Sequence, residues 1–218
     1  MEISREQYKA FLRMRSNMLK KNIARMAREK IVLRIPWLIF IDEDTTIGEG
    51  TIIEPFTVIH QGCHIGARCH IASFSTLADS VVGNESKIGS NSQVFHSQLG
   101  KGCEVGDIQI VRSNLRNNCK AKHGRYIGDA HIGDNVNWGA GSVTCNYDGK
   151  KKNKTVIGSG AFIGSGCMLV APVEIGRDAY TAAGSVITKN VPPEALAIGR
   201  TRQKNKLNWA QKMKKNRT

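Results

Sequence analysis

Aliphatic residues recur at intervals of six along most of this chain. The first run has six consecutive intervals of six residues and comprises Ile41, Ile47, Ile53, Ile59, Ile65, Ile71 and Leu77. The pattern continues over 82–105 with two five-residue steps, and it returns over 127–138 and 157–187. Gly or Ala often follows the aliphatic residue, and a small residue often stands four positions after it. Neither the period of a helix nor the alternation of a strand explains this spacing.

A short strand followed by a tight corner does explain an interval of six. Three such units close a triangular coil of about eighteen residues, and successive coils stack as a solenoid. Glycine after the aliphatic residue relieves crowding at the bend. The pattern resembles the hexapeptide repeat of left-handed parallel β-helices. The left hand is implied by this resemblance alone, because it runs against the usual right-handed crossover. We therefore expect an all-β fold, a left-handed parallel β-helix over residues 36–199, with a loop inserted at 144–155.

The segment before the solenoid predicts an amphipathic helix from residue 4 to about residue 33, within an N-terminal unit of residues 1–35. Ser4 and Gln7 form a capping-box pattern at its start, and Pro36 closes it. The apolar stripe comprises Tyr8, Phe11, Leu12, Met18, Leu19, Ile23 and Met26. We expect this helix to pack on the first coil or against a partner subunit. A helix lying on a membrane surface is the alternative.

The net charge of +14 belongs to the two ends of the chain. Residues 1–30 carry nine Lys or Arg against three acids, and the basic C-terminal tail of residues 200–218 carries eight and no acid. The body, 31–199, therefore balances at fifteen against fifteen. Neither end resembles a nucleic-acid-binding module, so we expect no nucleic-acid partner. Since no apolar run reaches membrane-spanning length and the start is unlike a signal peptide, we expect no membrane association and a cytoplasmic location.

The six cysteines have neither paired nor zinc-type spacing. Cys63, Cys69, Cys103 and Cys167 stand in the small-residue position of their hexads, so we expect buried packing residues in a reduced protein. The segment "CHIGARCH" looks like a metal cluster. However, residues six apart lie on adjacent faces of the triangle and diverge, so we expect no bound metal.

Three irregular segments interrupt the repeat: residues 107–126, the hexads near 138, and the loop 144–155, "TCNYDGKKKNKT". A regular solenoid face has no cleft, so the chemistry should gather where regularity fails. These segments hold a polar set made of Lys120, Lys122, His123, Arg125, Tyr126, Asn137, Asn146, Tyr147, Asp148 and Lys150 to Lys154. His123 ends the first irregular segment, and histidine is the natural general base for an amine or hydroxyl nucleophile.

The stretches "KHGRYIGDAHIGDNVNWGAGSVTCNYDG", "LVAPVEIG", "AAGSVIT" and "ALAIGR" are similar to one family, over roughly residues 120–200. That family is the C-terminal acetyltransferase domain of the bifunctional N-acetylglucosamine-1-phosphate uridylyltransferase/glucosamine-1-phosphate acetyltransferase. The resemblance implies a homotrimer with active sites between neighbouring solenoids. It also implies acetyl-CoA as co-substrate and a small-molecule amine, an amino sugar, as acceptor.

The same resemblance implies roles on the acceptor side of the reaction. His123 is the general base. The matched acceptor-binding residues are Tyr126, Asn137, Asn146, Tyr147 and the loop lysine Lys152. Lys152 would reach toward a phosphate near the sugar.

On the donor side, the resemblance places Ala140 at the thioester, with its backbone N–H as an oxyanion donor. Ser165, Ala183 and Arg200 line the CoA groove, and a guanidinium such as that of Arg200 suits phosphate groups. Asn146 and Tyr147 border the acetyl group as well as the acceptor.

The chain departs from the family pattern mainly on the acceptor side. Phe95 and His96 stand where the family has arginines that clamp the acceptor phosphate. Arg112 or Arg116 would have to replace the family's upstream lysines, and the acid that backs the histidine falls near Gln109.

We therefore expect an acetyl-CoA-dependent N-acetyltransferase for an amino sugar, with glucosamine-1-phosphate as one candidate and no uridylyltransferase activity. An aminoglycoside-like or nucleotide-linked amino sugar is the alternative acceptor. A non-catalytic solenoid scaffold is the alternative of a different class.

Overall fold

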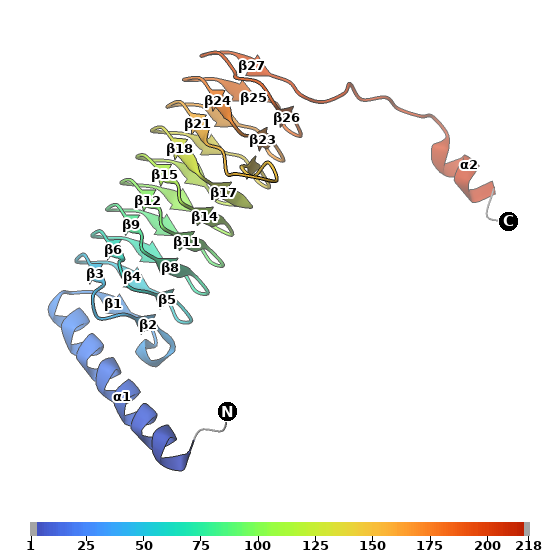
Figure 1. Cartoon of the computed structure of the whole chain (residues 1–218). Helices are drawn as coiled ribbons and strands as arrows, with labels where there is room; N and C mark the ends of the chain where they lie inside the picture. The colour runs from blue at the N-terminus through green and yellow to red at the C-terminus, as the bar shows by residue number, and fades with distance from the viewer. Residues whose placement is uncertain (1–3, 216–218) are drawn as a thin grey trace.

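The solenoid dominates the computed structural model, which describes residues 4–215. Short parallel strands stack into a three-faced coil, with helix α1 (Arg5–Arg28) at its N-terminal end (Figure 1). A second helix, α2 (Trp209–Lys215), lies near the C-terminus, beyond the last coil. The predicted parallel β-solenoid is confirmed, and its left hand stays a prediction.

The strands form three parallel sheets, one on each face of the prism. Face 1 contains β1 (Val32–Leu33), β4 (Ile52–Ile53), β7 (His70–Ile71), β10 (Lys87–Ile88), β13 (Glu104–Val105), β16 (Lys120–Ala121), β19 (Asn137–Trp138), β22 (Phe162–Ile163), β25 (Tyr180–Thr181) and β27 (Leu196–Ala197). Face 2 contains β2 (Phe40–Ile41), β5 (Val58–Ile59), β8 (Thr76–Ala78), β11 (Gln93–Phe95), β14 (Gln109–Val111), β17 (Tyr126–Gly128), β20 (Val143–Cys145), β23 (Met168–Val170) and β26 (Val186–Ile187). Face 3 contains β3 (Thr46–Ile47), β6 (His64–Ile65), β9 (Val81–Val82), β12 (Gln98–Leu99), β15 (Asn114–Leu115), β18 (Ala130–Ile132), β21 (Thr155–Ile157) and β24 (Val173–Ile175).

The repeated aliphatic residues fill the centre of the prism. All seven members of the first hexad run, from Ile41 to Leu77, are at most 7% exposed. Cys63, Cys69, Cys103 and Cys167 are buried as well, which confirms their packing role. In the segment "CHIGARCH" the cysteines point into the core while His64 and His70 occupy outward positions, so these side chains do diverge.

The length of a coil varies along the solenoid. Ile52 pairs with His70, eighteen positions later, and Lys87 pairs with Glu104, seventeen positions later. Glu104 in turn pairs with Lys120, only sixteen positions later. The five-residue steps in the sequence are therefore corners that lose one residue while the strands stay in register.

The predicted end of the N-terminal helix is wrong by about five residues, which is more than the usual uncertainty of a helix boundary. Its capping box is present, with Ser4 N donating to Gln7 Oε1 at 2.9 Å and Gln7 N to Ser4 Oγ at 3.2 Å. The helix ends at Arg28, because Ile31 enters the core and β1 pairs with β4. The aliphatic residues after Arg28 pair as a strand and do not extend the helix. The solenoid therefore begins at β1, before the predicted domain boundary at residue 36.

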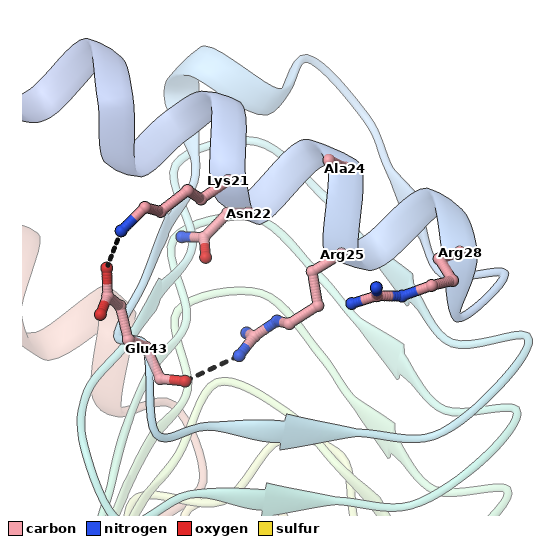
Figure 2. A pocket seen from close by; sticks show the side chains of 6 residues that line it. All are labelled: Lys21, Asn22, Ala24, Arg25, Arg28 and Glu43. Carbon is pink, nitrogen blue, oxygen red and sulfur yellow. Dashed lines mark hydrogen bonds and ion pairs between the residues drawn. The ribbon is translucent and has the colours of Figure 1, made fainter.

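The last turns of α1 hold the helix on the first coil. Asn22 Nδ2 donates to Ile41 O at 2.9 Å, and Arg25 Nη1 donates to Glu43 O at 2.7 Å. Figure 2 shows Lys21 and Arg25 both reaching Glu43. Met26 is 1% exposed in the core. By contrast, the first half of α1 leaves its apolar side chains exposed, and it extends away from the solenoid (Figure 1).

The C-terminal tail leaves the last coil as an extended segment that ends in α2. Lys206 Nζ lies 5.1 Å from the centre of the Trp209 ring, a cation–π contact within the tail. The last three residues of the predicted basic tail lie outside the described part. Within residues 4–215, no helix has the length and apolarity that crossing a bilayer requires.

We expect Met26→Ala to destabilise the docked helix by about 2–5 kcal/mol, because it empties a buried site. Met14→Ala is the control, because Met14 is 55% exposed on the same helix and should change stability by less than about 0.5 kcal/mol. Urea unfolding followed by circular dichroism measures both. Equal changes in the two variants would contradict the docking.

Candidate functional site

Four of the predicted site residues form one column along the edge between faces 1 and 2. The carbonyl of His123 accepts from Gly141 N at 2.8 Å. The carbonyls of Ala140 and Ser165 accept from Gly166 N and Gly184 N, each also at 2.8 Å. Each corner is therefore bonded to the same corner of the next coil, and the column comprises His123, Ala140, Ser165 and Ala183.

Arg200 lies at the C-terminal end of this column. Its Cδ is 3.8 Å from the position that a Cβ would take at Gly184, the residue after Ala183. The side chain is exposed. The structure thus brings together the general-base candidate and every residue predicted only for the CoA groove.

Two hollows open on either side of His123, and His123 lines both. One hollow, of about 330 Å³, lies toward face 1 and is lined by Lys120, Lys122, Asn137, Trp138, Gly139, Ala140, Phe162 and Ser165. The other, of about 540 Å³, lies toward face 2 and is lined by Asn91, Gln93, Asp107, Ile108, Gln109, Gly124, Arg125 and Gly141. We name them the donor hollow and the acceptor hollow after the roles proposed for them below. An imidazole between two open spaces can transfer a proton between molecules held in each.

An aromatic pair extends face 1 beyond the donor hollow. Asn137 pairs with Phe162 and Phe162 with Tyr180 in successive strands. The two rings are stacked, with centres 5.4 Å apart and planes 19° apart. Asn137, predicted to bind the acceptor, thus lines the donor hollow, whereas Tyr126 lies on face 2 in β17.

The inserted loop is shorter than predicted, because β20 and β21 take both of its ends. Residues 146–154 remain as a small hairpin, in which Tyr147 pairs with Lys152. Asp148 accepts from the backbone N of Lys150 and of Lys151, both at 2.8 Å, and from Asn153 Nδ2 at 2.8 Å. These bonds, that from Lys151 first, lower the pKa of Asp148 to about 2.

A polar network ties this loop to the solenoid at the edge between faces 2 and 3. Asn146, which is 7% exposed, donates from Nδ2 to Asp129 Oδ2 and to Tyr126 Oη, the latter at 3.3 Å. Asp129 also accepts two bonds from Arg112, at 2.7 and 2.8 Å. Arg112, predicted as a substrate ligand, therefore has its guanidinium engaged by Asp129.

Asp129 is the residue that sequence reasoning missed. Arg112, Asp129 and Asn146 are each seventeen positions apart, which is the local length of a coil. This spacing could have predicted from the sequence that the three residues stack on successive coils. The hydrogen bonds from Arg112 lower the pKa of Asp129 most, and the bond from Asn146 lowers it as well. Burial raises this pKa, but the net result is a lowered value. The charge of Lys152 lowers it further, so Lys152 also acts on this carboxylate.

We expect Asp129→Asn to loosen the loop, because it removes the charged partner of Arg112 and Asn146. A charged hydrogen bond contributes about 1.5–3 kcal/mol. Trypsin should therefore cleave after the loop lysines, Lys150, Lys151, Lys152 and Lys154, about tenfold faster or more. Asp134→Asn is the control, since Asp134 accepts from Asn117 N at 3.0 Å away from the loop. Equal cleavage rates in both variants would contradict the anchoring role.

The loop should resist mild acid. Asp129 and Asp148 both have a pKa below the ordinary value. A lowered folded-state pKa gives stabilisation that is complete above the unfolded-state pKa and is lost as the pH falls through the folded-state value. Amide NMR signals of residues 147–153 should therefore persist at about pH 4, where free aspartate is half protonated. They should disappear only toward pH 2. Loss of the signals near pH 4 would contradict this order.

The comparisons with known proteins agree with this architecture. The model for the bacterial transferase hexapeptide (six repeats) matches residues 44–79 and 154–189. The structure of a UDP-N-acetylglucosamine acyltransferase from Francisella novicida superposes with a TM-score of 0.68 at 18% identity, covering 77% of this chain and 67% of that one. A UDP-N-acetylglucosamine acyltransferase from Campylobacter jejuni gives 0.68 at 16% identity, covering 84% and 77%. At these identities the likeness concerns the fold.

Sequence relatives are more similar to this chain. A bifunctional protein GlmU from Thermodesulfovibrio yellowstonii is 40% identical over 199 residues, which is 83% of this chain and 44% of the relative. The protein of the same name from Thermosipho melanesiensis is 44% identical over 215 residues, 88% of this chain and 48% of the relative. The one from Thermotoga maritima is 49% identical over 138 residues, covering 62% and 31%. The chain thus spans less than half the length of these curated relatives.

Proposed function

We propose that this chain, a hexapeptide-repeat solenoid homologous to part of the GlmU proteins, transfers an acetyl group from acetyl-CoA to the amine of an amino sugar. The observation that carries the proposal is the column of His123, Ala140, Ser165, Ala183 and Arg200, with a hollow on each side of His123. The GlmU relatives support an acyltransferase, and the matched motifs support the acetyltransferase portion of those bifunctional proteins.

The donor runs along the column in this proposal. The small side chains of Ala140, Ser165 and Ala183 leave room for the extended arm of CoA. Arg200, at the far end, holds phosphate oxygens with its planar guanidinium. This orientation brings the thioester to Ala140, beside His123. Gly141 N is already bonded to His123 O, so the backbone N–H of Ala140 is the donor that faces the developing oxyanion.

His123 acts as the general base. The acceptor amine must be neutral to attack, and the His123 imidazole accepts its proton as the nitrogen adds to the thioester carbonyl. The tetrahedral oxyanion then collapses, the carbon–sulfur bond breaks, and the imidazolium returns the proton to the CoA thiolate. The acetyl group has moved from sulfur to nitrogen, and the histidine is neutral again.

Direct transfer requires no covalent enzyme intermediate. Cys145 is the thiol nearest in sequence to Asn146, and burial raises its pKa. A thiol with a raised pKa has little thiolate at neutral pH and is a poor nucleophile. Cys145 therefore has a packing role in this proposal.

The proposed assembly is a homotrimer. Both hollows lie open at one edge of a single solenoid, and a neighbouring solenoid packed along that edge would close them against water. Closure of this kind strengthens the electrostatic interactions of a site. Active sites formed between subunits follow from this arrangement.

The test is release of free thiol from acetyl-CoA in the presence of amino sugars. We expect His123→Ala to lower turnover by about 10²–10⁴-fold, the usual contribution of a general base. The variant should still be stabilised thermally by acetyl-CoA, because the donor groove is intact. His131→Ala is the control, since His131 is exposed on face 3.

Full turnover of His123→Ala would refute the general-base role. If millimolar acetyl-CoA did not raise the melting temperature of the unmodified chain, the proposed acetyltransferase activity would be refuted. A scaffold function would then be the better explanation.

A further inference from the structure

We infer that the acceptor binds in the acceptor hollow on face 2, and that its hydroxyl groups, not an anionic group, are what the protein recognises there. The inference rests on the proposed function and specifies its substrate class. The acceptor is an amino sugar that carries no phosphate on the part lying on face 2.

Face 2 presents an uncharged platform beside this hollow, and Gln93 and Gln109 of the platform also line the hollow. Gln93, Gln109 and Tyr126 are register partners on β11, β14 and β17. Two positions further along the same strands, Phe95 pairs with Val111. All five side chains are outward, with inward residues buried between them. The platform therefore combines amides and a phenol with an apolar strip.

Such a platform suits a sugar ring. A side-chain amide both donates and accepts hydrogen bonds, as a hydroxyl group does. Gln109 Nε2 already donates to Gln93 Oε1 at 2.9 Å, which orients both amides along the face. The apolar strip of Phe95 and Val111 can cover the C–H face of a pyranose. Dispersion and apolar burial then add to the hydrogen bonds.

The charged groups around the platform are balanced. Among the described residues besides His123, one acidic and one basic residue line the acceptor hollow, Asp107 and Arg125. Asp107 is a suitable partner for the ammonium form of the acceptor before His123 receives its proton. At the opposite edge of face 2, Arg112 donates two hydrogen bonds to the Asp129 carboxylate.

Two further basic groups near face 2 lie close to acids. His96 Nδ1 lies 3.4 Å from Asp79 Oδ2, and the charge of Lys152 acts on Asp129. A phosphate bound by Arg112 would have to compete with the bidentate carboxylate of Asp129.

Thiol-release kinetics test the substrate class. We expect kcat/KM for glucosamine to exceed that for glucosamine 1-phosphate and for UDP-glucosamine by about tenfold or more. The three molecules share the same amine and differ in the anionic group. An equal or higher kcat/KM for either phosphate-bearing sugar would overturn the inference.

Binding measured without turnover tests the site itself. In the presence of CoA, ligand-observed NMR should detect glucosamine, and Gln93→Ala should weaken that binding about tenfold. The control is Gln98→Ala, because Gln98 has a matching amide contact on face 3, with Asn114 Nδ2 at 3.3 Å. Unchanged binding in Gln93→Ala, or no detectable binding of glucosamine, would overturn the inference.

Failure of the two proposals can be told apart. If thiol is not released with any sugar while glucosamine still binds through Gln93, the proposed function is wrong and the site assignment stands. If thiol is released but glucosamine 1-phosphate is preferred, acetyl transfer stands and the acceptor class is wrong.

Discussion

The backbone ladder between coils is the constraint on which every other feature of this molecule depends. Each short strand bonds to the strand one coil before and one coil after it, in parallel and in register. Adjacent strands in a sheet lie about 4.8 Å apart. The number of residues in a coil therefore determines which surface side chains of successive coils lie next to each other. The column from His123 to Ala183 and the trio Arg112, Asp129 and Asn146 both arise in this way.

In-register stacking also dictates how charges are distributed. Like charges one coil apart would repel at this spacing, and the surface alternates signs instead. Arg68 Nη2 lies 2.6 Å from Glu85 Oε1, and Lys101 Nζ lies 3.4 Å from Glu85 Oε2. The Arg112–Asp129 pair follows the same rule at the edge of the candidate site. The exposed ion pairs of Glu85 contribute little to stability. The Arg112–Asp129 pair, by contrast, also orients Asn146 and with it the loop.

The inserted loop shows how a solenoid accepts irregular structure without losing its core. The ladder continues past the insertion, because β20 pairs with β23 and β21 with β18 and β24. The hairpin at 146–154 therefore projects from one corner while its two ends stay fixed. Its own hydrogen bonds to Asp148 keep it compact, and the link through Asn146 sets its direction. The proposed chemistry lies at His123, at the end of another irregular segment, as expected for a fold whose regular faces offer no cleft.

The sequence by itself determined the repeat, the buried aliphatic residues, the packing role of four cysteines and the capped start of α1, because each of these depends on residues close together in the chain. The resemblance also pointed to His123, Ala140, Ser165 and Ala183, which the structure places in one column; their roles stay predictions. Tertiary structure decided the end of α1, the engagement of Arg112 by Asp129 and the position of His123 between two hollows. These features depend on which residue of one coil lies above which residue of the next. A corner that is one residue longer or shorter changes that register. The hexad pattern alone therefore does not determine where the side chains of successive coils meet.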